Sequence, residues 1–393
     1  MRGVLKFLLT LVFGLALIWI GFWWYAQAQL QTGFTAWAER QASEGAQVSY
    51  DALHRGTSIM AAAITLDNFS MTLPRALEGK PIVLSMPSLT LRIDALNPLV
   101  FHIDLPDKIF LTLAGRFSTV LDVGGSSMTE DLDPDVVFNR GAYPFRASDI
   151  RFDHLDILAS GSLLLLHFDH LASHEILDVK AGPDRSALVA RFTCEGVAVS
   201  PLFTRLASLP FQGSLARLDM ALALSGPLPP DLSDLLEQAN AMGDNRQAQA
   251  SLLEPAIRRW ASQGGTGNVR FHMVLGPTTM DAAGSLRFDK AGQPYGTADL
   301  SADHLDQFTT ALADSYPVLR NDIAEAEARL SPDLVNTPQG GQTLIQHIVY
   351  GQSGIFINGR KAGDMPPTVW SDAASTPTPG APADAPPKTN GTP

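Results

Sequence analysis

The densest group of metal-binding side chains in this sequence is a histidine-rich segment. His167, His170 and His174 are followed directly by Glu175, and imidazole and carboxylate groups are ordinary zinc ligands. Zinc sites on helices show the tighter H-E-x-x-H spacing, with the glutamate between the histidines. The segment also begins in a strand-like run, which would point His167 and His170 to opposite faces. The pattern therefore favours solvated histidines over a metal site.

A run of acidic residues from Glu130 to Asp135 resembles the start of a calcium-binding loop. Counted from Asp131, such a loop needs glycine at the sixth position and glutamate at the twelfth. The chain has Val136 and Ala142 at those positions. The segment is therefore interpreted as a solvated acidic loop.

The sequence contains no nucleophile in a recognisable catalytic setting. The serine in Gly351-Gln-Ser-Gly354 lacks the G-x-S-x-G spacing of a nucleophile elbow, and neither a P-loop nor a G-x-G-x-x-G motif occurs. Cys194 is the only cysteine, so no intramolecular disulfide is possible, and its strand-like surroundings favour a buried apolar role. These observations predict a protein that is not an enzyme, with no catalytic residue and no cofactor.

The strongest signal in the sequence is the apolar run from Phe7 to Tyr25, and no charged residue occurs between Phe7 and Ala38. About 20 apolar residues in a helix cross a hydrocarbon core of about 30 Å. The run therefore predicts a transmembrane helix, with the lipid bilayer as its partner. Its proposed anchoring residues are Phe7, Leu11, Leu15, Trp19, Trp23, Trp24 and Tyr25.

The flanking residues predict the orientation of this helix. Arg2 and Lys6 precede the run, and basic residues stay cytoplasmic whereas aromatic rings settle at the headgroups. We therefore expect a single-pass protein of the bacterial inner membrane, with a cytoplasmic N-terminus and its bulk in the periplasm. A cleaved signal peptide is the alternative, because Ala26-Gln27-Ala28 fits the A-x-A pattern.

The charge of the chain limits its partners. The formal net charge is −12, with 40 Asp and Glu against 28 Lys and Arg. Nucleic-acid binding needs a basic surface, so this class of partner is excluded. Hydrophobic residues make up 45% of the chain, enough for a sizeable core.

Beyond the first helix, short runs with period-two alternation predict an antiparallel sheet. Examples are Ile64–Leu73, Ser88–Leu96 and Phe101–Leu105. The expected fold class is mainly β (α+β), a curved sheet or half-barrel with helical insertions. The expected parts are an anchor (1–28), a helical stalk (29–45), a β-rich region (46–229), a β-rich region with two insertions (230–370) and a disordered tail (371–393).

The two insertions have helical periodicity. One spans Pro230–Trp260, and its Pro255 is expected near the first turn of a helix. The other spans Leu305–Leu330 and is broken at Pro317. The tail from Ser371 to Pro393 is rich in Pro, Ala and Thr and lacks periodicity, which indicates disorder.

Some strands are apolar beyond strict alternation, notably Leu163–Leu166 and Ile109–Leu113. A sheet with one face in water should alternate, whereas a sheet covered on both faces need not. An apolar face could hold acyl chains or could be covered by the helical insertions. Both interpretations stay open.

With these features in place, the chain resembles an uncharacterised bacterial envelope family with a domain of unknown function, in the style of AsmA-like proteins. The resemblance is carried by the N-terminal segment Met1–Tyr25, Leu66–Phe69, the hairpin Gly284–Leu300 and the ending Phe356–Pro367. It implies a periplasmic β-rich body and a role in lipid handling or envelope maintenance. It transfers no catalytic residue.

The expected function is therefore a non-enzymatic one. The leading hypothesis is an anchored periplasmic protein that binds lipid or another apolar ligand. The alternative is an anchored scaffold that binds another envelope protein, and an anchored hydrolase ranks third.

Overall fold

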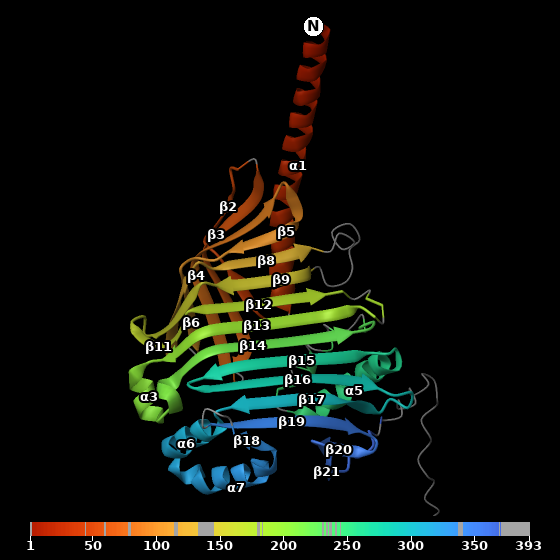
Figure 1. Ribbon diagram of the computed structural model, residues 1–393. Helices are drawn as coiled ribbons and strands as arrows, with labels where there is room; N and C mark the ends of the chain where they lie inside the picture. The colour runs from red at the N-terminus through yellow and green to blue at the C-terminus, as the bar shows by residue number, and fades with distance from the viewer. Residues whose placement is uncertain are drawn as a thin grey trace, which may run out of the picture.

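The protein is described here by a computed structural model, in which one long helix leads into a large twisted β-sheet (Figure 1). The described residues are 2–43, 45–58, 60–77, 80–113, 117–132, 145–178, 181–182, 184–229, 232, 235, 238–239, 242–243, 245–336, 341–368 and 370.

The N-terminal half contains one long helix and thirteen strands among the described residues. Helix α1 spans Arg2–Ser43. The strands are β1 (Gln47–Ser49), β2 (Ala52–Arg55), β3 (Ala61–Leu77), β4 (Lys80–Asp94), β5 (Asn97–Asp104), β6 (Lys108–Leu113), β7 (Phe117–Gly124), β8 (Ser127–Leu132), β9 (Phe145–Phe152), β10 (His154–Ala159), β11 (Leu163–Phe168), β12 (His170–Leu177) and β13 (Ser186–Val199).

The C-terminal half adds strands and short helices. The helices are α3 (Pro201–Ala207), α5 (Arg246–Ser262), α6 (Leu305–Ser315) and α7 (Arg320–Leu330), with the 3-10 turns η1 (Pro210–Gly213), η2 (Pro317–Leu319) and η3 (Ser331–Asp333). The strands are β14 (Ser214–Ser225), β15 (Thr266–Leu275), β16 (Thr278–Phe288), β17 (Pro294–Asp303), β18 (Leu334–Asn336), β19 (Gln342–Gly351), β20 (Gly354–Ile357) and β21 (Arg360–Gly363).

The hydrogen-bonded ladder closes on itself in the N-terminal half. One edge of β4 pairs antiparallel with both β5 and β6. One edge of β13 pairs in the same way with both β12 and β11. The series β5–β8–β9–β12 and β6–β7–β10–β11 therefore both connect β4 to β13. From β13 the sheet continues as β14, β15, β16, β17 and β19.

The main core lies within this closed part. Alternate residues of a strand point to the same face, and Ile64 and Leu66 of β3 are fully buried in this way. They pack with Leu91 of β4, Val123 of β7 and Phe34 of α1. Period-two alternation in the sequence thus becomes a single apolar interior.

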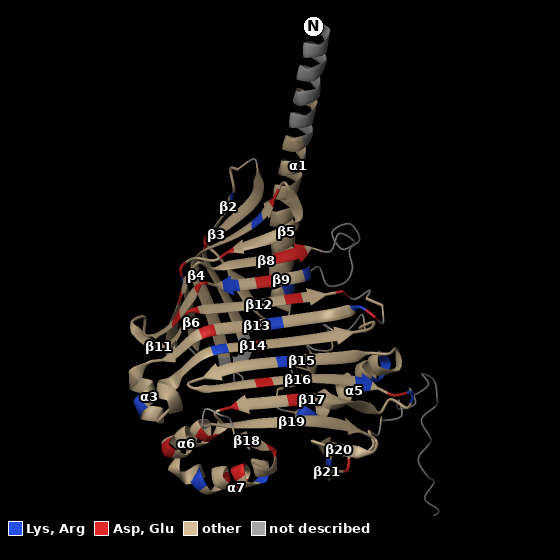
Figure 2. Cartoon of the chain, viewed as in Figure 1, with Lys and Arg blue, Asp and Glu red and all other residues tan. Residues whose placement is uncertain are grey.

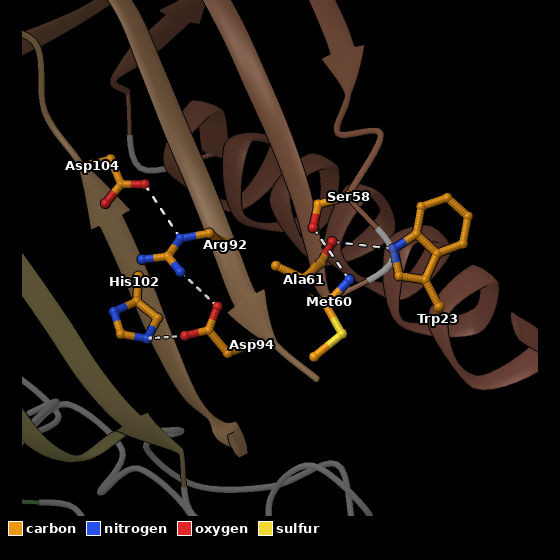
Figure 3. Close-up of polar contacts among 8 residues, drawn as sticks. All are labelled: Trp23, Ser58, Met60, Ala61, Arg92, Asp94, His102 and Asp104. Carbon is orange, nitrogen blue, oxygen red and sulfur yellow. Dashed lines mark hydrogen bonds and ion pairs between the residues drawn. The ribbon is translucent and has the colours of Figure 1, made fainter. Parts of the chain in front are cut away.

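Helix α1 is attached to the first residues of β3, beyond the segment of that strand that pairs with β2. The Gln27 side chain accepts a hydrogen bond from the N–H of Ala63 (3.0 Å) and donates one to its carbonyl oxygen (2.5 Å). One turn earlier, the Trp23 indole N–H donates to the carbonyl oxygen of Ala61 (3.1 Å; Figure 3). The helix thereby satisfies backbone groups that would otherwise need a neighbouring strand.

The predicted antiparallel β-rich fold with helices is confirmed. Helices α6 and α7 lie where Leu305–Leu330 predicted a pair broken at Pro317. Pro255, by contrast, lies inside α5 rather than near its start. The buried side chains of Ala256 and Trp260 hold this part of the helix against the sheet, which offsets the backbone hydrogen bond that proline removes.

Only part of the predicted anchor lies among the described side chains. Within the described residues, no helix combines the length and apolar composition required to cross a membrane. The side chains of Phe7, Leu11 and Leu15 lie outside the described part of the chain, as does the predicted tail from Ser371 to Pro393. The membrane-spanning assignment therefore stays a prediction.

Candidate functional site

The C-terminal half of the sheet has two chemically different faces. Cross-strand register places Arg191, Arg270 and Asp299 in one row, on what we call the outer face. The neighbouring row, on the inner face, contains Phe192, Met220, Phe271 and Leu300. Side chains alternate between faces along each strand, so polar and apolar residues are separated across the sheet.

The outer face is charged and hollow. Figure 2 shows acidic and basic positions spread over β8 to β17. A hollow of about 750 Å³ is lined by outer-face residues that include Arg191, Arg270 and His272. His272 pairs with Asp281 at 2.7 Å and His347 with Asp299 at 2.6 Å. This surface combines such charged pairs with apolar side chains such as Ile345.

Both ends of the inner face are covered by helices. At one end, Trp260 of α5 packs edge-on against Phe288 with ring centroids 5.6 Å apart, and its indole N–H donates to the carbonyl oxygen of Ser225 (2.9 Å). At the other end, Leu305 and Phe308 of α6 pack against Leu344 of β19.

Among the described residues, no helix covers the middle of the inner face. Met220, Leu222 and Val269 are 46%, 38% and 48% exposed. Leu222 and Val269 are direct cross-strand neighbours on β14 and β15, and Met220 is two residues along on the same face. We call these three residues the apolar patch. Scattered apolar residues on a surface are ordinary, but here they are contiguous and lie between two helix-covered ends.

Residues 23–342 match the model of a family described as uncharacterised proteins conserved in bacteria (DUF2125). The chain belongs to this family. No curated protein and no solved structure matches the chain. The predicted membership of an uncharacterised bacterial family is thus confirmed, while the likeness to AsmA-like proteins stays a prediction.

The histidine segment of this DUF2125 chain is a set of cross-strand pairs. His167 contacts Asp156 at 2.5 Å and Asp169 at 3.0 Å, and His174 contacts Asp149 at 2.6 Å. The hydrogen bonds that His167 donates, to Asp156 first and then to Asp169, raise the pKa of His167. In the described part of the chain, no three such groups converge to hold a metal ion.

The acidic segment is only partly described, since Asp133 and Asp135 lie outside the described residues. Glu130 is buried on β8 and accepts a hydrogen bond from the Ser148 hydroxyl (2.8 Å). Burial raises the pKa of Glu130, the Ser148 hydrogen bond opposes this, and neighbouring Glu175 adds to the rise. The carboxyl is therefore a core group rather than part of a solvated loop.

The remaining predicted residues fall in different places. Cys194 is buried, and burial raises the pKa of its thiol, which disfavours a nucleophilic thiolate. Ser353 lies in the turn between β19 and β20. On α1, the Trp23 side chain donates a hydrogen bond to Ala61 of β3, whereas the side chains of Trp24 and Tyr25 are exposed.

The sequence did not predict the apolar patch, because its most continuous apolar runs lie in other strands. Leu163–Leu166 and Ile109–Leu113 belong to β11 and β6, in the closed part of the sheet. The available signal was the alternation of Met220, Leu222 and Leu224 with smaller residues along β14. It predicts an apolar face without telling which part of that face a helix covers.

Proposed function

We propose that this DUF2125 chain is a membrane-anchored envelope protein that binds a lipid acyl chain, or a similar apolar ligand, on the inner face of its sheet, without chemical conversion. The observation that carries the proposal is the apolar patch between α5 and α6. Full burial of a Val, Leu or Met side chain stabilises by about 1.5–3 kcal/mol. Binding of a ligand that covers these three half-exposed side chains would therefore be favoured by a free energy of comparable size.

The anchor half of the proposal rests on sequence. The run from Phe7 to Tyr25 has the length and composition of a bilayer-crossing helix, and Arg2 and Lys6 orient it with the N-terminus in the cytoplasm. The sheet would then lie in the periplasm of the inner membrane.

The ligand half is tested by native mass spectrometry of the full chain released from detergent micelles. We expect the wild-type protein to carry a bound lipid. A double variant, Leu222→Ser with Val269→Ser, should lose that adduct and keep its fold, because both side chains are already half exposed.

The matched control is Ile345→Ser with Val349→Ser, which removes two similarly exposed apolar residues from the outer face of the same sheet. This variant should retain the lipid. A wild-type chain free of lipid, or equal loss in both double variants, would contradict binding at the apolar patch.

A further inference from the structure

The end of the sheet from which α1 projects exposes several large apolar side chains. Met60, in the loop between β2 and β3, is 50% exposed, and Leu96, in the turn between β4 and β5, is 79% exposed. Trp24 and Tyr25 of α1 are exposed as well. We call these four residues the tip.

Hydrogen bonds hold the tip together. The N–H of Ala95 donates to the carbonyl oxygen of Met60 (2.9 Å), which joins the two loops. The next residue, Ala61, accepts the Trp23 indole hydrogen bond (Figure 3). The loops and the adjoining turn of α1 therefore occupy one level of the molecule.

The charged groups behind the tip are paired with one another. Arg92 contacts Asp94 at 2.6 Å and Asp104 at 3.5 Å, and His102 contacts Asp94 at 3.3 Å (Figure 3). Because these carboxylates are paired, the desolvation cost of bringing this end against an apolar medium is reduced.

The length of α1 places the tip at the membrane boundary. The apolar part of α1 before Trp23 begins at Phe7. At about 1.5 Å per residue it rises roughly 24 Å, which is most of a hydrocarbon core of about 30 Å. Trp23, Trp24 and Tyr25 then fall at headgroup level, where aromatic side chains are favoured. The hydrogen bonds described above hold Met60 and Leu96 at the same height along the helix axis as Trp23.

We infer that the tip is a lipid-docking surface: Met60 and Leu96 enter the headgroup region of the bilayer that takes α1, so that the sheet stands on the membrane in one orientation. The inference rests on the proposed anchor and goes beyond it, since a single membrane helix would leave the sheet free to change its tilt relative to the bilayer. Apolar groups of interfacial segments lie about 5–10 Å into the headgroup and acyl boundary.

The test uses the full chain in lipid vesicles. Cys194, the only cysteine, is replaced by Ala, and a single cysteine at Leu96→Cys carries an environment-sensitive fluorophore. Lipids with a nitroxide near the headgroup should quench this fluorophore several-fold more than one at Val318→Cys, an exposed position between α6 and α7. Met60→Cys, as a second position, should behave like Leu96→Cys.

The outcomes separate the two proposals. If the chain floats with the vesicles but Leu96 and Met60 are quenched no more than Val318, the docking surface is overturned and the anchor stands. If the chain does not float with the vesicles, the proposed anchor fails and the docking surface fails with it.

Discussion

Six histidine residues in the described part of the chain are paired with aspartates on neighbouring strands. Besides His167 and His174, the pairs are His54–Asp67, His102–Asp94, His272–Asp281 and His347–Asp299. The partners of His174 and His347 are 25 and 48 residues away along the chain. Spacing within one segment therefore could not identify these pairs.

His167 makes the pairing testable through pH. Its raised pKa means that the folded state binds the proton more tightly than the unfolded state. The resulting stabilisation is complete below the unperturbed value of about 6.5 and is lost as pH rises through the higher folded pKa. His167→Gln should therefore lower the urea midpoint of unfolding more at acidic than at alkaline pH.

The matched control for this variant is His154→Gln. Within the described residues, no ion pair joins His154 to a carboxylate. Its replacement therefore measures the background effect of a histidine-to-glutamine change on the midpoint. A His167→Gln effect that does not vary with pH would argue against proton-linked stabilisation by Asp156.

At the scale of elements, the sequence predicted which segments form helices and strands but not how they dock. Hydrophobic periodicity is local, so it located α6, α7 and the β16–β17 hairpin. Docking depends on contacts between distant segments, such as Trp260 with Phe288 or Gln27 with Ala63. For this reason the uncovered part of the inner face was visible only in the folded chain.

The attachment of α1 to β3 yields a prediction about Gln27. This side chain is 1% exposed and makes both of its hydrogen bonds to Ala63. Gln27→Ala leaves the Ala63 N–H without its partner, whereas the Ala63 carbonyl oxygen keeps the hydrogen bond from the Gly56 N–H (2.7 Å). One buried donor left unpaired costs about 1–3 kcal/mol. Equilibrium unfolding of the full chain in detergent measures this loss.

Gln29 is the matched control, because it is an exposed glutamine on the same helix. Gln29→Ala should change the free energy of unfolding by less than about 0.5 kcal/mol. Equal effects at the two positions would mean that the Gln27 side chain does not hold the helix to the sheet.

At the scale of the whole molecule, the architecture separates two tasks. The closed part around β4 and β13 buries its own core and receives α1, whereas the extension from β14 to β19 keeps an apolar face that its helices cover only at the ends. Alternation along the strands predicted a mainly β chain, but ring closure depends on β4 and β13 each pairing with two strands along one edge. No local pattern encodes that arrangement.

The most direct test of lipid binding on the inner face is photolabelling of the full chain with a fatty acid that carries a diazirine in its acyl chain. After irradiation and proteolysis, labelled peptides are identified by mass spectrometry. The account predicts labelling within β14 and β15, at or beside Met220, Leu222 and Val269. Labelling confined to α1, with none on β14 or β15, would contradict it.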